Sequence, residues 1–268
     1  MSVQQDKFKV IADKIREKTG TTEGIKPNDF ANKIDDVYEQ GKTDENKVWW
    51  DIITVNGTRT FLEYMFRNWD CEYIRPPYKL TAKIAPNITQ SRAMHVFSHN
   101  PSLLCVEKEY FDFSECTTSD TSSNVGLYYT FSRCPKLKYI EDIGLPAGYL
   151  YNTYASCSSL EKIEMIRMNK STGNYQAFSG CNSLVYVRFE GEIGKSITFS
   201  SSPLDKDSIT DIINHLCADT DVTGQTLTLN LDAVKKAFET SEGANNGNAS
   251  KEWADLKATK TNWTISAI

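Results

Sequence analysis

The sequence predicts an α+β protein in which an N-terminal helical hairpin is followed by a short β-rich repeat solenoid and an α/β C-terminal cap. Three observations predict this class. Apolar residues recur at helical spacing in the first 41 residues, a phrase of aromatic, small residue and Leu recurs through the middle of the chain, and helix-like and strand-like patterns alternate after residue 204. A chain of 268 residues is long enough to hold all three parts.

The hairpin is predicted over residues 1–45. Its first helix shows the spacing i, i+3, i+4, i+7 and ends at Gly20, and its second begins near Pro27 and ends before Gly41. A hairpin of this length is too short to hold a core of its own, so it must pack on a second copy or on a partner. We therefore expect an attachment or oligomerisation module.

Residues 46–92 are predicted to be a transition and an N-terminal cap for the repeats. Aromatic residues are dense between Trp49 and Tyr78. An apolar plug that seals the first repeat is the favoured interpretation. A platform on which sugar rings stack is the alternative, because exposed aromatic faces bind apolar ring surfaces.

The repeats occupy residues 93–204. Four copies of the phrase place an aromatic, a small residue and a Leu at intervals of three, and a shortened echo follows at Phe199. The aromatics are separated by 34, 23, 24 and 21 residues, so the period is close to 23. The repeat positions are Phe97, Asn100 and Leu103; Phe131, Cys134 and Leu137; Tyr154, Cys157 and Leu160; and Phe178, Cys181 and Leu184.

A unit of this length cannot bury its own apolar face, so it must stack on its neighbours. Each Leu is predicted to open a short strand, and the strands are predicted to lie parallel, about 4.8 Å apart, with aromatic and Leu side chains pointing inward. Asn and Cys are expected to be interchangeable at the middle position because both are small. The chain has 7 cysteines and no CxxC pair, which favours free thiols over a disulfide framework or a metal site.

Residues 205–268 are predicted to cap the last repeat. Asp205 is suited to begin a helix with an apolar stripe through Ile209 and Ile213. A strand is expected around Leu227–Leu231, then two short helices, and a closing strand near Trp263.

Two stretches resemble known families. The phrase F-x-x-C-x-x-L with its 23-residue spacing is similar to the BspA-type leucine-rich repeat of surface, adhesion and some phage tail proteins, over residues 94 to 204. The stretch from Ile15 to Phe30, followed by Tyr38-Glu-Gln-Gly-Lys and Trp49-Trp-Asp, resembles the opening module of tail-associated proteins of phages that infect Gram-positive bacteria. In those proteins the module precedes varied C-terminal domains, which implies attachment to other tail or baseplate proteins through residues 1–45.

Composition excludes several classes of function. The net charge is −5 and the basic residues are scattered, which disfavours nucleic acid as a partner. No apolar run approaches the roughly 18–20 residues of a membrane span, so membrane insertion is not expected. The polar N-terminus lacks the pattern of a secretory signal peptide. We therefore expect synthesis in a host cytoplasm, and the resemblance to phage tail proteins implies a place in the virion tail.

Residues for catalysis are scarce, and we expect neither an enzyme nor a cofactor. His95 and His99 have the spacing of a metal-binding pair, but Val96 stands where the zinc-protease pattern needs Glu. Glu190 and Glu192 are close in sequence, but glycosidase carboxylates need a cleft that tunes one of them. No metal site and no catalytic residue is predicted.

The expected function is that of a non-enzymatic tail fibre or baseplate protein that binds a polysaccharide or protein on the bacterial surface through its repeats. A bacterial leucine-rich-repeat interaction protein and a purely structural tail spacer remain as alternatives. A homo-oligomer is expected by analogy with tail fibres, many of which are trimers. Outward positions on the strand face are the receptor-binding candidates: Lys138, Tyr139, Glu161, Lys162, Val185 and Tyr186.

Overall fold

A computed structural model describes residues 66–75, 80–81, 95–114, 127–144, 149–239 and 250–268. The chain divides into two compact units, Met1–Gly57 with Arg75–Leu80, and Thr58–Ile74 with Thr81–Ile268. Nearly all described residues belong to the second unit, which contains the repeats. The predicted helical hairpin at 1–45 lies outside the described residues, as does most of the 46–92 transition, including Trp49 and Tyr78.

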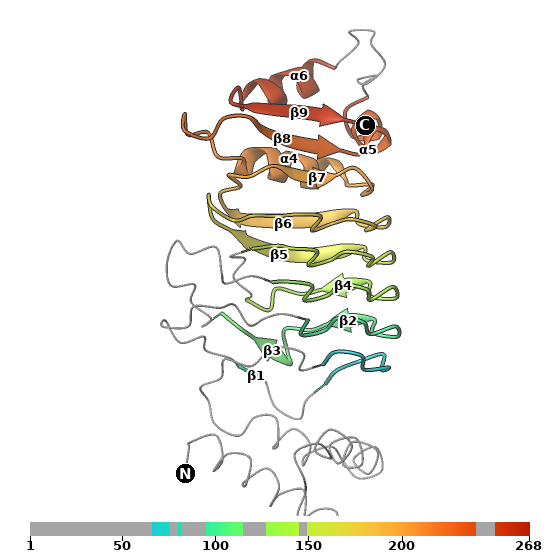
Figure 1. Cartoon of the computed structure of the whole chain (residues 1–268). Helices are drawn as coiled ribbons and strands as arrows, with labels where there is room; N and C mark the ends of the chain where they lie inside the picture. Colours follow the sequence, from blue (N-terminus) through green and yellow to red (C-terminus); the bar gives the residue numbers. More distant parts are fainter. Residues whose placement is uncertain (1–65, 76–79, 82–94, 115–126, 145–148, 240–249) are drawn as a thin grey trace, which may run out of the picture. The chain divides into compact units, whose positions relative to one another are not determined.

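Short parallel strands stack from rung to rung in the second unit (Figure 1). One sheet has the order β2-β4-β5-β6 and a second has the order β7-β8-β9, and every pairing in both is parallel. Strands β1 and β3 make a separate pair. The strands are β1 Leu80–Thr81, β2 Cys105–Val106, β3 Phe111–Asp112, β4 Tyr139–Ile140, β5 Lys162–Met168, β6 Tyr186–Gly191, β7 Ile197–Phe199, β8 Gln225–Leu229 and β9 Trp263–Ala267.

The predicted α+β class is wrong. The larger sheets are parallel, and the helices of the described residues, α4 (Lys206–His215), α5 (Leu231–Phe238) and α6 (Lys251–Ala258), alternate with β7, β8 and β9, so this part of the chain is mixed α/β. The expected single solenoid is also replaced by three separate sheets. Phe199 marks the change between the two larger sheets, since it occupies the aromatic position of the repeat but lies in β7, whereas the preceding aromatics lie in turns or bends.

A column of stacked aromatic rings forms the centre of the rungs. Phe97 and Phe131 have ring centroids 5.2 Å apart, Phe131 and Tyr154 5.5 Å, and Tyr154 and Phe178 5.3 Å. The column ends on Phe199, 4.4 Å from Phe178. All five rings are buried, and burying a ring of this size removes about 150–250 Å² from water. The column is therefore the main apolar support of the stack.

The small residue at the middle of each phrase donates to a backbone carbonyl of the preceding rung. The Cys134 thiol donates to the Phe97 carbonyl at 3.1 Å, and Cys157 donates to Phe131 at 2.9 Å. Cys181 repeats the contact on Tyr154, and Asn100 makes it through its amide. Residue size alone therefore does not explain this position, since each occupant also satisfies a buried acceptor. The predicted free thiols are confirmed for Cys134, Cys157, Cys181 and Cys217.

The remaining repeat predictions hold with one adjustment. Every predicted aromatic, small residue and Leu of the phrase is buried. Each strand in the four-stranded sheet, however, begins two residues after the Leu, as β4 does after Leu137. The Leu residues face the core from the turn that leads into the strand.

Phe66 begins a rung that the repeat pattern did not reveal. Its ring is fully buried and stacks on Phe97 at 5.4 Å, and its carbonyl accepts from the Asn100 amide at 2.6 Å. Trp69 packs edge-on against the same ring. The predicted plug is therefore confirmed for Phe66, whereas Tyr73 is 43% exposed.

The C-terminal segment follows the sequence prediction closely. Asp205 caps α4 by accepting from the Ser208 amide at 2.7 Å, and Asn230 and Ser250 cap α5 and α6 in the same way. The apolar stripe of α4 is buried, and Trp253 of α6 is fully buried. Strand β9 closes the segment beside β8 (Figure 1).

Candidate functional site

The outward side chains of β4, β5 and β6 form a continuous column. Tyr139 pairs in register with Lys162, and Lys162 pairs with Tyr186. The next residues along these strands, Ile140, Ile163 and Val187, are buried. Because alternate residues of a strand point to opposite faces, Tyr139, Lys162 and Tyr186 lie together on the face away from the core.

A second column lies beside the first and consists of the residues that directly precede β4, β5 and β6. Lys138, Glu161 and Val185 are all exposed, and backbone bonds from Lys162 to Lys138 and from Val185 to Glu161 join them. Lys138 and Glu161 lie 3.5 Å apart, and Val185 is 42% exposed. The structure therefore brings all six receptor-binding candidates together. We call these two columns the strand strip: Lys138, Tyr139, Glu161, Lys162, Val185 and Tyr186.

A cation lies between the two tyrosines of the strip. The Lys162 Nζ is 4.9 Å from the Tyr139 ring centroid and 5.0 Å from that of Tyr186. The Arg188 guanidinium covers Tyr186 at 4.3 Å. Contacts of this kind are worth about 0.5–1 kcal/mol at an exposed site. They hold both rings in place, and both rings remain partly exposed to solvent.

Glu164 anchors the edge of the strip. It accepts a hydrogen bond from the Tyr139 hydroxyl and forms an ion pair with Lys162 at 3.2 Å. Burial, followed by the interaction with Glu164, raises the pKa of Tyr139. The phenol therefore stays protonated at neutral pH and keeps donating to the carboxylate.

An ion-pair network that the sequence pattern did not predict flanks the strip. Arg167 of β5 donates to both carboxylate oxygens of Asp142, at 2.6 and 2.9 Å, and lies 3.2 Å from Glu190. The hydrogen bond from Arg167 is the main cause that lowers the pKa of Asp142. Glu190, which the sequence places near Glu192, therefore forms an ion pair with Arg167. The sequence signal that could have predicted this ion pair was the outward position of Glu190 in β6.

His95 and His99 do not form a metal-binding arrangement in the structure. The Nδ1 atoms of both rings face the Ser98 hydroxyl, at 3.0 and 3.2 Å, and the ring centroids are 6.1 Å apart. Burial and the Arg67 charge lower the pKa of His95 to about 4 and also lower that of His99. Arg133 lies 3.4 Å from the Nε2 of His99, and a cation so close disfavours a metal ion.

Glu192, Cys217 and Asp219 bring their ligand atoms within 4.8 Å of one another. The Lys170 ammonium, however, lies 2.6 Å from both Asp219 and Asp221. Lys170 is therefore already paired with the Asp219 carboxylate of the cluster, the Cys217 thiol faces Glu192, and burial raises the pKa of that thiol. This cluster is therefore a surface ion pair beside a protonated thiol.

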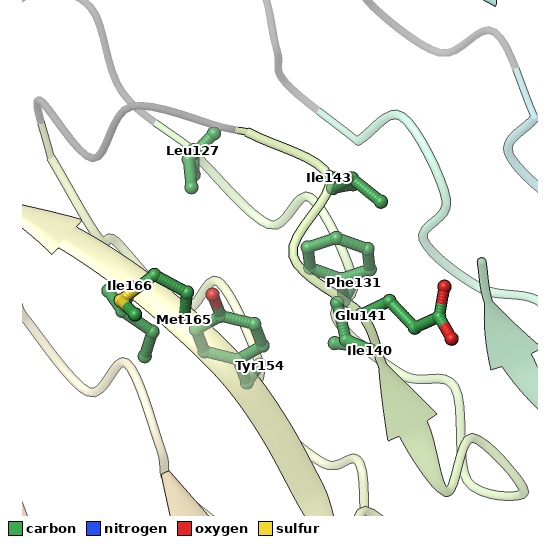
Figure 2. Close-up of a pocket in the computed structure, with 8 residues that line it drawn as sticks. All are labelled: Leu127, Phe131, Ile140, Glu141, Ile143, Tyr154, Met165 and Ile166. Atoms are coloured by element: carbon green, nitrogen blue, oxygen red, sulfur yellow. The ribbon is translucent and has the colours of Figure 1, made fainter. Parts of the chain in front are cut away.

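A small pocket lies between β4, β5 and the core (Figure 2). It has room for about one water molecule. The Tyr154 hydroxyl faces apolar neighbours there, and the Glu141 carboxylate points away and accepts from the Lys108 amide at 2.6 Å. The lining residues are Leu127, Phe131, Ile140, Glu141, Ile143, Tyr154, Met165 and Ile166. No two polar groups among them converge on a common reacting atom.

Comparison with known proteins identifies no relative, since no family model, curated protein or solved structure matches the chain. Among the described residues, no helix combines the length and the apolar character that crossing a membrane requires.

Proposed function

We propose that this chain is a non-enzymatic component of a phage tail or baseplate that binds a polysaccharide or protein on the bacterial surface. Residues 1–45 attach it to other tail proteins, and the strand strip contacts the receptor. The setting rests on the resemblance of residues 15–51 to the opening module of phage tail proteins. A homo-oligomer, with a trimer as the typical fibre form, would multiply a weak contact.

The strand strip is the observation that carries the receptor-binding role. Its six side chains are exposed or half-buried, yet their backbone is fixed by parallel pairing on both sides of β5. Tyr139 and Tyr186 are held by a shared lysine, so little rotamer freedom remains to be lost on binding. Tyrosine and arginine, here Tyr186 and Arg188, are also the residues that dominate binding energy at interfaces.

The charge pattern of the strip suits a polar receptor. Lys138 pairs with Glu161 of the next rung, and Lys162 pairs with Glu164 within β5, so charges of both signs lie close together. Such a mixed surface fixes the orientation of a partner more than it adds affinity. A tail spacer has no need of this organisation on a solvent-exposed face.

The test uses the full-length protein displayed in many copies on fluorescent beads and a panel of Gram-positive strains. Wild-type beads are expected to label some strains and not others. The double variant Lys162→Ala with Tyr186→Ala is expected to bind those strains at least about tenfold more weakly, because it removes a ring and the cation that holds its neighbour.

The matched control is Lys236→Ala, which removes an exposed lysine from α5. Circular dichroism and thermal melting of all three proteins show whether the fold is kept. Equal labelling by the double variant and the control would contradict the assignment of the strip. Absence of labelling on every strain, the phage host included, would favour a spacer or an intracellular partner.

A further inference from the structure

The turns that precede the strands form a second ordered surface. In each turn, the residue two before the inner aromatic has positive φ: His95 at 57°, Tyr129 at 53°, Asn152 at 50° and Gln176 at 50°. Amides of one turn donate to carbonyls of the next, as Tyr129 does to Tyr151 and Asn152 does to Tyr175. The turns are therefore stacked and fixed as strictly as the strands. We call residues 127–133, 149–156 and 173–180 the turn edge.

Tyrosines run along this edge in a column. Tyr128, Tyr151 and Tyr175 each lie three residues before an inner aromatic. The ring centroids of Tyr128 and Tyr151 are 5.7 Å apart, and those of Tyr151 and Tyr175 are 5.2 Å apart. Tyr149 stacks on Tyr128 at 5.1 Å, and Tyr129 meets Tyr151 edge-on at 5.4 Å. These five residues make up the tyrosine ladder. Tyr175 ends it with 54% of its surface exposed, and the other four are partly exposed.

The ladder is rigid before any ligand arrives. Tyr149 lies against Gly173, where a Cβ atom would overlap its ring. A side-chain hydrogen bond with Tyr129 raises the pKa of Tyr151, so the phenols interact with each other as well as through their rings. Rings held in this way lose little conformational entropy when they contact a partner.

The edge around the ladder carries almost no charge. Residues 149–160 and 171–184 contain no Asp, Glu, Lys or Arg, although such residues make up 24% of the chain. Within the turn edge, Arg133 at the end of the first turn is the one charged residue, and it is exposed. Asn152 and Gln176, which directly follow Tyr151 and Tyr175 in the chain, carry uncharged amide side chains instead. The charged strand strip on the same rungs shows that this lack of charge is a property of the turns.

We propose that the tyrosine ladder binds an uncharged glycan chain. Phenol and amide groups offer both donors and acceptors to sugar hydroxyls, and the open face of Tyr175 and the ring edges offer apolar contact to sugar C–H groups. An anionic polymer would find Arg133 as the single countercharge on the turn edge, and a cationic partner would find none there. This inference goes beyond the proposed function, because it assigns a second contact surface formed by different residues.

The size of the ladder also favours a glycan. Its central column extends over two ring-to-ring steps of 5.7 and 5.2 Å. A specific protein interface usually needs about 800 Å² on each partner. Five partly buried tyrosines in a narrow row provide much less than that, whereas a chain of a few sugars lies along such a row.

The test measures binding of the full-length protein to an array of defined neutral and anionic oligosaccharides and to protein-free cell-wall polysaccharide from Gram-positive bacteria. Wild-type protein is expected to bind neutral glycans, with affinity unchanged in about 1 M salt, where charge interactions are screened beyond about 3 Å. Tyr175→Ala is expected to weaken binding about tenfold. Tyr175→Phe, which keeps the ring, should weaken it less.

Several outcomes would overturn the proposal: absence of binding to every neutral glycan, equal binding by Tyr175→Ala, or binding to anionic glycans alone that salt abolishes. Tyr175 is exposed, so its variants are expected to fold, and thermal melting checks this. The strand-strip variant Lys162→Ala with Tyr186→Ala is measured in parallel. If it keeps glycan binding but loses cell binding, both assignments stand. If the strand-strip variant loses glycan binding, the assignment of the tyrosine ladder fails. If it keeps cell binding, the assignment of the strand strip fails.

Discussion

Removing the ring of Phe131 tests whether the aromatic column holds the rungs together. Phe131 is 1% exposed and stacks on Phe97 at 5.2 Å and on Tyr154 at 5.5 Å. Truncating a buried Phe to Ala costs about 3–5 kcal/mol, because both transfer energy and packing are lost. At about 2–4 °C per kcal/mol for a domain of this size, the Tm of Phe131→Ala should fall by about 10 °C.

The assay is denaturant and thermal unfolding of wild type, Phe131→Ala and Phe131→Leu. The leucine variant refills most of the volume and should lose only about 1–2 kcal/mol. A double-mutant cycle with Tyr154→Leu isolates the ring–ring contribution, which is expected at about 0.5–1.5 kcal/mol. Lys236→Ala serves as the surface control, expected within about 0.5 kcal/mol of wild type.

A loss below about 1 kcal/mol for Phe131→Ala, with native circular dichroism, would refute the reasoning, since a buried ring of this kind should cost several times more. It would mean that the rungs are held by their backbone bonds alone. A coupling energy near zero in the cycle would show that burial of each ring matters and that stacking between rings does not.

Three further predictions concern single residues. Lowering the pH should destabilise the protein through His95, because its folded pKa of about 4 lies below the usual value of 6.5. Between about pH 6.5 and pH 4 the unfolded chain holds a proton on His95 that the folded protein does not, so stability is full above about pH 6.5 and falls towards pH 4. His95→Asn should reduce this dependence of the free energy of unfolding on pH, as measured by denaturant titrations at several pH values. Burial raises the pKa of the Cys157 thiol, so mass spectrometry should find it unlabelled by thiol reagents until the protein unfolds; labelling of the folded protein would contradict this. In Gly194→Ala the new methyl group would overlap the Lys170 carbonyl oxygen, so chemical unfolding should show a free energy of unfolding lower by about 2 kcal/mol or more. Gly224→Ala is the comparison, because Gly224 has positive φ but open space around it, and it should lower the free energy of unfolding by about 1 kcal/mol.

The repeat phrase was sufficient to predict the core of the rungs. Aromatic and Leu positions are bulky and periodic, and residues such as Phe131 and Leu137 have no other place than the interior. Strand alternation indicated that some residues among Lys138, Tyr139, Glu161 and Lys162 point outward, but it did not decide which. These features depend on local pattern, and local pattern is visible in one sequence.

Other features depend on contacts that no pattern announces. Phe66 lacks the Cys and Leu that follow the other aromatics, so its rung was missed. The donor role of Cys157 needs the position of a carbonyl on the preceding rung. Tyr151 and Tyr175 come together because consecutive turns stack, and their place in irregular backbone hides any strand or helix period. The class was misjudged because the pairing direction of the strands, parallel in both larger sheets, depends on which segments meet and not on local pattern.

The spacing of the rungs has a consequence for how this chain tolerates change in length. The step from Phe97 to Phe131 is 34 residues and the next is 23, yet the ring separations across them are 5.2 and 5.5 Å. The additional residues of the longer step therefore leave the contact between rungs undisturbed. Segments between one strand and the following turn are consequently the places to insert foreign sequence. An added whole repeat would extend the strand strip and the tyrosine ladder together, whereas one residue added within a phrase would shift both out of register.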